Sequence, residues 1–438
     1  QAASVVAEGL FDEFALFDTM MSLVDKSLVA VEYRGPSQRF RLMEPLRQYA
    51  LALLKECGEL EATALQHALY FSTWTQREGS KYQQVPDLTF VATIEEEIDN
   101  IRAALEWALV KGNDPVLGAE LASNVGGFWF TQHYHEGLRW LEAAGAAVTY
   151  EGQMALSVRI AIFRMRAFIQ TDLNKTLQIG EAAEGSVRAL GDGVVFGRFA
   201  VFYGGALVQV DRLDEGEAIL QEGLAWSERL DDPYRIAFIL LNLARLNRKR
   251  GRLDVARALS RRMVEVYERC APSGDRNRWI VWSQRASFEE YDGRIGRAIE
   301  LCREAYGDTE LAKDTVGGVQ IEYYLGVLLL RSGNLDEARL HGRSVLSIGR
   351  EEALPHAIDR AIQLLSGVAA HTGRYELAAG LLGYADPRLS QGDFMLDVDR
   401  DWFLQPLRAH FGDTVLAQLM AEGAAWTQAR AIEMASAV

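Results

Sequence analysis

The residues with the clearest potential for chemistry are arginines in the middle of the chain. Residues 235–303 carry 16 Lys and Arg against 8 Asp and Glu, a net charge of +8, whereas the whole chain carries 46 − 61 = −15 and the remainder therefore −23. Cations at a helix C-terminus are favourable through the helix dipole alone, by about 0.3–1 kcal/mol each. The alternative is that they attract an anionic ligand or an acidic protein surface. This basic belt consists of Arg245, Arg248, Lys249, Arg250, Arg252, Arg257, Arg261 and Arg262.

Patterns typical of catalysis do not occur in the sequence, which has no GxSxG, HExxH or GxGxxG. His133, His135 and Glu136 could be written as a metal cluster, but residues i and i+2 of a helix point apart, which favours ordinary turn residues. We therefore expect no enzyme activity, no metal and no cofactor in this chain. Trp74, Trp402 and Trp426 are expected to fill irregular cores. Three distant cysteines without a CxxC pair, Cys57, Cys270 and Cys302, argue against a disulfide framework or a structural zinc site and indicate a reducing compartment.

The composition favours a helical protein. Of 438 residues, 49% are hydrophobic and only nine are proline, which argues against a sandwich or barrel. The net negative charge repels phosphate backbones, so we expect no direct nucleic-acid binding by this chain. No run approaches the roughly 20 apolar residues that cross a bilayer, and the N-terminus has neither an initiator Met nor the features of a signal peptide. We expect a cytoplasmic protein without membrane contact, cut from a longer polypeptide.

The first 57 residues are predicted to form a small winged-helix domain. A helical apolar pattern covers residues 13–26. Two strands over 28–33 and 38–43 flank a Gly-Pro turn at 34–37, and a further helix begins around Pro45.

From residue 60 onwards the chain repeats itself. Five segments align, each a Gly or Asp followed five places later by a small residue: Asp211–Gly216, Gly251–Ala256, Gly293–Ala298, Gly333–Ala338 and Gly373–Ala378. Their starts are 40, 42, 40 and 40 residues apart, and weaker matches at Thr171 and His133 continue the series upstream. The turn residue ends one helix, and the small residue lets the next helix pack closely. Because one helix pair cannot bury its own apolar face, the pairs must stack.

The predicted fold is all-α: a right-handed α-solenoid of tetratricopeptide-like helix pairs with repeats of about 40 residues, preceded by a small winged-helix domain with one β-hairpin. We divide the chain into a winged-helix domain at 1–57, a helical lever or linker at 58–132, a sensor solenoid at 133–386 and C-terminal capping helices at 387–438. The alternative is a non-repeating helical bundle, against which the near-equal intervals argue.

The concave surface of such a solenoid is the most promising place for a ligand. The first helix of each pair lines the groove, so counting back from each turn gives the positions expected to face inward. An apolar floor with a few charged heads suits a small polar or amphipathic ligand. The alternative for each position is a solvated residue without function. The candidate ligand-binding residues are Phe130, Met165, Arg198, Arg245, Arg248, Tyr323, Arg360 and Gln363.

Three stretches carry a resemblance to a known family: Leu23-Val-Asp-Lys-Ser-Leu28 with Arg39-Phe-Arg-Leu-Met-Glu-Pro-Leu-Arg-Gln-Tyr-Ala50, then 95–109, and Ala379-Gly-Leu-Leu-Gly-Tyr384 continued to Trp426. The chain resembles the C-terminal winged-helix and tetratricopeptide-like sensor region of bacterial STAND-class (NB-ARC-like) ATPase transcriptional regulators. In that family an inducer binds the solenoid and releases an ADP-locked monomer. ATP then replaces ADP, the protein oligomerises, and a separate effector domain acts on DNA.

The resemblance implies that this chain is the sensor part of such a switch. The loop G-x-x-x-x-G-K-[ST] occurs nowhere in it, so the ATPase module, with its ATP or ADP, is expected upstream. Relatives with a Met-His-Asp-like motif after the wing place a His against the ADP phosphate. This chain has Leu42-Met43-Glu44 there, so that His is absent.

The expected function is to bind an inducer, a small and possibly anionic molecule, in the solenoid groove. Binding would release the autoinhibited ATPase, which contacts this chain within one polypeptide, and the full-length protein would then oligomerise. The rival is a docking scaffold that grips a peptide or partner protein. An enclosed aromatic pocket favours the first hypothesis, and an open polar trough favours the second. An enzyme of unrecognised type is a third alternative.

Overall fold

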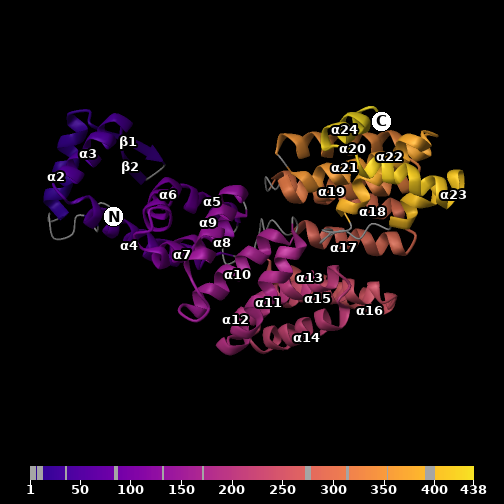
Figure 1. Cartoon of the computed structure of the whole chain (residues 1–438), viewed down its shortest axis with the longest axis horizontal. Coiled ribbons are helices and arrows are strands. Elements are labelled where there is room, and N and C mark those ends of the chain that lie inside the picture. Colours follow the sequence, from indigo (N-terminus) through magenta and orange to yellow (C-terminus); the bar gives the residue numbers. More distant parts are fainter. Residues whose placement is uncertain are drawn as a thin grey trace. The chain divides into compact units, whose positions relative to one another are not determined.

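The computed structural model describes residues 6, 13–34, 37–82, 87–130, 133–169, 172–271, 278–311, 315–352, 354–389 and 400–438. Apart from one β-hairpin, the regular structure of these residues is helical (Figure 1), which confirms the predicted all-α class. The chain forms two compact units, one of Gln1–Tyr82 with Thr89–Ile160 and the other of Gln83–Leu88 with Ala161–Val438.

The first unit begins with a helix, a hairpin and a helix: α2 (Glu13–Asp25), β1 (Val29–Arg34), β2 (Ser37–Leu42) and α3 (Glu44–Glu56). The strands are antiparallel, with Val31 opposite Phe40, and Pro45 lies in the first turn of α3. The predicted helices and hairpin are confirmed to within one residue at their ends. Residues 7–12 and 35–36 lie outside the described part, and the winged-helix assignment stays a prediction.

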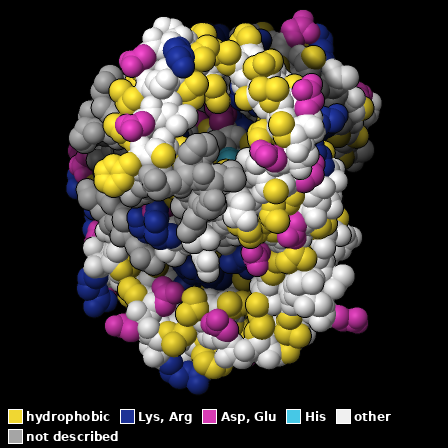
Figure 2. All heavy atoms as spheres, turned by 90° about the vertical axis from the view of Figure 1, so that its left-hand side faces the viewer, with side chains coloured by type: hydrophobic (Ala, Val, Ile, Leu, Met, Phe, Trp, Pro, Cys, Tyr) yellow, Lys and Arg dark blue, Asp and Glu magenta, His cyan; other side chains and the backbone are white. Residues whose placement is uncertain are grey.

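Helices α2 and α3 leave many apolar side chains in solvent. All residues of α3 are described, and none of them is buried. Phe14 is 86% exposed and Tyr49 is 64% exposed. Figure 2 looks onto the side of Figure 1 where these helices are drawn and shows hydrophobic side chains at the surface among charged ones. We call the following set the N-terminal apolar face: Phe14, Phe17 and Met21 of α2, Phe40, Leu42 and Met43 at β2, and Tyr49 and Leu53 of α3.

The hairpin is tied to the helices that follow it. Arg39 of β2 forms an ion pair of 2.8 Å with Glu97. The predicted winged-helix and lever regions lie in one unit, which ends between Ile160 and Ala161. The predicted boundaries after residues 57, 132 and 386 stay a prediction. The unit continues with α4 (Leu60–Gly79), α5 (Asp87–Glu95), α6 (Ile98–Leu105), a π-helical turn (Glu106–Val110), α7 (Pro115–Asn124), α8 (Gly126–Trp129), α9 (Tyr134–Ala147) and the first part of α10 (Met154–Phe168).

The second unit is a series of helices that pack successively, such as α15 on α16 and α21 on α22. Its regular elements are α11 (Leu173–Leu190), α12 (Gly193–Phe199), a π-helical turn (Ala200–Gly204), α13 (Gly205–Gln209), α14 (Leu213–Arg229), α15 (Pro233–Lys249), α16 (Leu253–Cys270), α17 (Arg278–Tyr291), α18 (Ile295–Leu311), α19 (Thr315–Arg331), α20 (Leu335–Glu351), α21 (Pro355–His371), α22 (Tyr375–Leu389), α23 (Arg400–Ala424) and α24 (Gln428–Ser436). Figure 1 shows these helices side by side within the unit.

The turns between paired helices are built as the repeat predicts. Positive φ angles of 61°, 72°, 76°, 85° and 79° occur at Asp211, Gly251, Gly293, Gly333 and Gly373. The amide after each of these residues donates back to the carbonyl five residues earlier, for example Arg252 to Asn247 at 2.8 Å. This left-handed cap satisfies carbonyls at the helix end and favours Gly, which has no Cβ to clash.

The small residue five places after each turn allows close helix packing, as predicted. Ala298, Ala338 and Ala378 are fully buried. A Cβ at Gly216 would lie 3.1 Å from the side chain of Val208 and 3.3 Å from the carbonyl oxygen of Gly204. The repeat pattern in the sequence is therefore a packing pattern in the structure.

The last helices cover the end of the stack. Helix α23 bends at Gly412, where φ is 71°. Trp426 packs so closely on α22 that a Cβ at Gly380 would lie 2.5 Å from its ring, and Trp402 stacks on His371 at 5.2 Å. These tryptophans fill the terminal core. Among the described helices, none is both long and apolar enough to cross a membrane.

Candidate functional site

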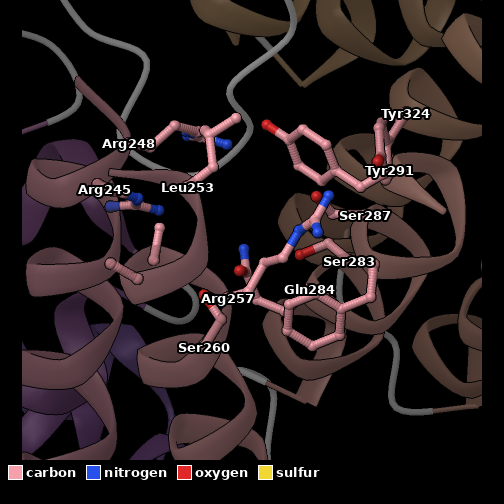
Figure 3. Close-up of a pocket in the computed structure, with 13 residues that line it drawn as sticks. Arg245, Arg248, Leu253, Arg257, Ser260, Ser283, Gln284, Ser287, Tyr291 and Tyr324 are labelled. Atoms are coloured by element: carbon pink, nitrogen blue, oxygen red, sulfur yellow. The ribbon is translucent and has the colours of Figure 1, made fainter. Parts of the chain in front are cut away.

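A polar cleft lies at the junction of α15, α16 and α17, with one residue from α19 (Figure 3). Its volume is about 50 Å³. We call it the arginine cleft, because Arg245, Arg248 and Arg257 line it, and no acidic residue occurs among its described lining residues. The lining residues are Ala244, Arg245, Arg248, Leu253, Ala256, Arg257, Ser260, Ser283, Gln284, Ser287, Phe288, Tyr291 and Tyr324.

Helical spacing places the lining side chains on common faces. Arg245 and Arg248 are three residues apart on α15, so they point to the same side. Ser283, Ser287 and Tyr291 follow at intervals of four along α17. Helices α16 and α17 are joined through the one repeat interval of 42 residues rather than 40. The cleft therefore lies at the junction where the repeat is lengthened.

Arg257 occupies the middle of the cleft. Figure 3 shows its side chain between the arginines of α15 on one side and Ser287 and Tyr291 on the other. Its guanidinium carbon lies 5.4 Å from the centroid of the Tyr291 ring. Arg245 donates to the side-chain oxygen of Asn242 at 3.3 Å. Three guanidinium groups, with no carboxylate among the described lining residues, make the cleft an electropositive site.

Other members of the basic belt are neutralised by the preceding repeat. Lys249 pairs with Asp211 at 2.7 Å, and Arg262 pairs with Glu228 at 2.5 Å. Arg250 pairs with both Asp214 at 2.5 Å and Glu217 at 2.6 Å. Three members of the belt thus line the cleft and three join neighbouring repeats through ion pairs, while Arg261 lies over the ring of Phe288 at 5.9 Å.

A polar link runs from the cleft into the next repeats. The Tyr324 hydroxyl donates to Glu290 at 2.7 Å, and Glu290 also forms an ion pair with Arg331. Burial, followed by the charge of Glu290, raises the pKa of Tyr324 well above its ordinary value, so its hydroxyl stays protonated as a donor. Arg331 in turn lies over the ring of Trp402 at 5.3 Å. The link connects the cleft with the C-terminal helices.

The structure places two of the eight candidate ligand-binding residues, Arg245 and Arg248, in the cleft. Phe130 is half-buried at the end of α8, in the other unit, and Arg198 is half-buried on α12. Met165 on α10 is fully buried, so its side chain belongs to the core rather than to an open groove.

The other three candidates lie together but are buried. Tyr323 is 0% exposed, Arg360 1% and Gln363 7%. The Tyr323 hydroxyl donates to Gln363 at 2.5 Å, and the Arg360 guanidinium lies 4.9 Å from the centroid of the Tyr323 ring. Arg360 also donates to His356 at 3.1 Å. Burial, followed by Arg360, lowers the pKa of His356 to about 3, so the imidazole is neutral and can accept that bond. The contacts of this buried cluster hold α19 against α21, so the cluster is part of the core packing.

Counting back from the repeat turns does not identify several residues of the cleft, including Ser260, Ser283, Gln284 and Tyr291. The signal that could have found part of this set is the spacing of four between Ser283, Ser287 and Tyr291, which puts them on one stripe of α17.

The residues written as a metal cluster do not meet as ligands. Among the described residues, no group of three or more His, Cys, Asp or Glu could hold a metal ion. His133 instead contacts Glu95 at 3.0 Å, and Glu136 accepts two bonds from Arg102 at 2.8 and 2.7 Å.

Comparisons with known proteins find partial relatives. No protein-family model matches the chain. It is 34% identical over 141 residues to proteins of Mycobacterium bovis and Mycobacterium tuberculosis whose names give them as candidate HTH-type transcriptional regulators. That stretch is 32% of this chain and 16% of each relative. The chain thus matches a small part of the relatives' length.

The comparison with solved structures gives matches of low similarity. One is a signal transduction ATPase with numerous domains and a tetratricopeptide repeat sensor from Pyrococcus horikoshii, at 12% identity over 95% of this chain and 62% of that one, with a TM-score of 0.46. Another is a tetratricopeptide repeat protein from Parabacteroides merdae, at 17% identity over 61% of this chain and 96% of that one, with a TM-score of 0.41. Scores below 0.5 do not establish a common arrangement.

Proposed function

We propose that the chain is the sensor part of a transcriptional regulator and that its helical repeats bind a small anionic inducer in the arginine cleft. The observation that carries the proposal is the cleft itself. Three arginines line it without an acidic residue among its described lining, in a chain whose net charge is −15. In a protein that is negative overall, a local positive site attracts anions selectively and raises their local concentration.

The position of the cleft suggests how binding would be transmitted. Its residues come from the helix pair α15–α16 and from the following helices α17 and α19. A ligand that contacts both sides stabilises the arrangement of repeats in which the contacts fit best, and it shifts the population only as far as it prefers that arrangement. The bonds of Glu290 with Tyr324 and Arg331 would carry the change towards the C-terminal helices.

The names of the mycobacterial relatives and the family resemblance support a regulatory role. On this proposal, an ATPase module that binds ATP or ADP lies upstream in the full-length protein and is held inactive by contact with this chain. Inducer binding releases that contact, and the full-length protein oligomerises. The chain itself holds no cofactor, performs no catalysis and binds neither nucleic acid nor membrane.

Thermal unfolding in the presence of small anions tests the proposal. A panel of carboxylates, phosphates and sugar acids should contain compounds that raise the midpoint of the chain by a few degrees, because a ligand at 100 times its dissociation constant adds about 2.7 kcal/mol. The R245A/R248A variant should lose the shift. The R262A variant is the matched control, since Arg262 is ion-paired outside the cleft. A panel without any shift, or shifts that persist in R245A/R248A, would contradict the proposal.

The size of the cleft supports a second candidate function. A volume of about 50 Å³ is well below the roughly 300–1,000 Å³ of pockets that enclose a drug-sized molecule. A carboxylate side chain of an acidic peptide would also fit, as in a docking scaffold. An acidic peptide that binds with dependence on Arg245 and Arg248, while the panel gives no shift, would favour this function.

A further inference from the structure

The donors in the arginine cleft exceed what a single carboxylate can use. Arg245, Arg248 and Arg257 bring three guanidinium groups from α15 and α16, and Gln284 brings an amide from α17. Ser260 of α16 adds a hydroxyl group, whereas the Ser283 hydroxyl already donates to the carbonyl oxygen of Ile280 at 2.8 Å and Ser287 is hydrogen-bonded to Tyr324. A phosphate group carries a charge of about −1.5 to −2 at neutral pH and presents three strong acceptor oxygens. Arginine forks match the geometry of such oxygens.

The volume of the cleft sets the size of the group it can hold. The volume of about 50 Å³ is that of a small cavity, since a single water molecule needs roughly 10–15 Å³. This is enough for a phosphate head group and too little for a whole metabolite. The remainder of a ligand must therefore lie at the mouth, where Tyr291 is 45% exposed and Leu253 is 44% exposed.

The mouth of the cleft is suited to a planar or apolar group. The exposed part of the Tyr291 ring and the Leu253 side chain can cover a ring, since aromatic pairs are stabilised beyond the area they bury. Arg257 lies against the same tyrosine ring, so one side chain faces both the head group and the ring.

We infer that the arginine cleft binds the phosphate group of a small phosphomonoester, with Arg257 as its central ligand and Tyr291 against the body of the molecule. This inference rests on the proposed function, because it concerns the same site and names the chemical class of the inducer. Arg245 and Arg248 bind the oxygens from the side of α15, and Ser260 and Gln284 supply neutral donors.

Isothermal titration of the 438-residue chain with three probes tests the inference. Inorganic phosphate presents the head group alone, phenyl phosphate adds a ring, and benzoate keeps the ring but replaces the head group with a carboxylate. The variants are R257A, R257K and the control R262A, in which the substituted residue lies on the same helix but is paired with Glu228. Thermal unfolding of each variant shows whether it is folded.

We expect phenyl phosphate to bind more tightly than either inorganic phosphate or benzoate. The R257A substitution should weaken the binding of phenyl phosphate by about tenfold or more, as expected for the loss of hydrogen bonds between charged groups. R257K keeps the charge but loses the fork, so it should also bind more weakly than the wild type. R262A should bind as the wild type does. If R257A does not fold, the conservative R257K variant decides.

Other outcomes would overturn the inference. Benzoate could instead bind as tightly as phenyl phosphate, with the same loss of affinity in the Arg257 variants. The cleft would then bind anions in general rather than phosphate in particular, and the proposed sensor function would still stand. Phosphate binding that is equal in R257A and the wild type would show that the cleft is not its site. If none of the three probes binds, the phosphate inference is wrong, and the proposed function is wrong as well only if the broader anion panel also gives no shift.

Discussion

Helices α3 and α21 show how differently two amphipathic helices of one chain can be covered. In α21 every residue from Ala357 to Ala370 is buried. In α3, all of which is described, none is buried, and Tyr49 and Leu53 are 64% and 40% exposed. Helix α21 has partners on several sides, namely α19, α20, α22 and α23. The comparison shows that an apolar period predicts a helix, whereas burial depends on the neighbours that the repeat supplies.

The pKa values of two carboxyl groups, one on each of these helices, are shifted in opposite directions. Burial raises the pKa of Asp359 on α21 from 3.8 to about 7, against the attraction of Arg388. On α3, hydrogen bonds from Arg47 and Gln48 lower the pKa of the exposed Glu44 from 4.5 to about 2. The buried helix thus favours the neutral acid, and the exposed helix favours the charged one.

The largest expected effect on stability comes from truncating one leucine on each of the two helices. L365A removes a fully buried side chain and should lower the free energy of unfolding by about 2–5 kcal/mol, because a cavity remains. L53A removes a side chain that is already 40% exposed and should change it by less than about 0.5 kcal/mol. Urea denaturation of both variants measures the difference. Equal losses would contradict the contrast between α21 and α3.

The pH dependence of stability should differ between Asp359 and Glu44. Between about pH 4 and 7 the native state keeps a proton on Asp359 that the unfolded state releases, so the wild type loses stability as pH rises through this range. The free energy of unfolding of D359N should therefore increase relative to that of the wild type as the pH rises, by on the order of 1–3 kcal/mol at pH 7.

The matched variant for this prediction is E44Q. Glu44 contributes stability above its ordinary pKa, and this contribution disappears as pH falls towards 2. E44Q should therefore differ from the wild type by a small, constant amount above about pH 5. Urea denaturation over a pH series compares the two. A D359N difference that does not change with pH would count against a buried neutral acid in α21.

Substitutions of two glycines should have effects of opposite sign. Gly333 has a φ of 85° at a repeat turn, so G333A should cost about 1–2 kcal/mol, because a residue with a Cβ is strained in the left-handed conformation. Gly185 lies inside α11, where a Cβ would have no other atom within 4 Å, so G185A should stabilise the chain by about 0.5–1 kcal/mol. Thermal unfolding measures both, and a stabilising G333A would argue against the turn geometry.

The smallest effect on stability is expected at the N-terminal apolar face. Phe14 and Phe17 are 86% and 57% exposed, so F14S/F17S should change the free energy of unfolding by less than about 0.5 kcal/mol. Exposed apolar side chains favour association, so the variant should self-associate less in analytical ultracentrifugation. A loss of more than about 1 kcal/mol would mean that these rings stabilise the fold.

The repeat turns could be predicted from the sequence because they depend on local chemistry. A left-handed turn favours Gly, and Gly251, Gly293, Gly333 and Gly373 recur at nearly constant spacing. The hairpin was predictable for a similar reason, since alternation and a Gly-Pro turn lie within a short stretch.

The cleft could not be predicted in full because its residues come from four helices, and the side that each helix turns to the others depends on how the repeats stack. Counting back from the turns assumed that the first helix of each pair keeps one face in the open. In the structure, Tyr323 and Gln363, forty residues apart, bond to each other inside the stack. The sequence indicates Arg257 only as part of a basic run, because nothing local shows that it faces Tyr291 rather than an acidic partner.

The most direct test of the central claim is amide hydrogen exchange of the chain with and without saturating inorganic phosphate, at constant ionic strength. If the arginine cleft is the ligand site, exchange should slow in segments 244–260 and 283–291, which line it. Exchange in α2 and α3 should not change. Unchanged exchange in the cleft segments at saturation, or protection confined to other helices, would contradict the claim.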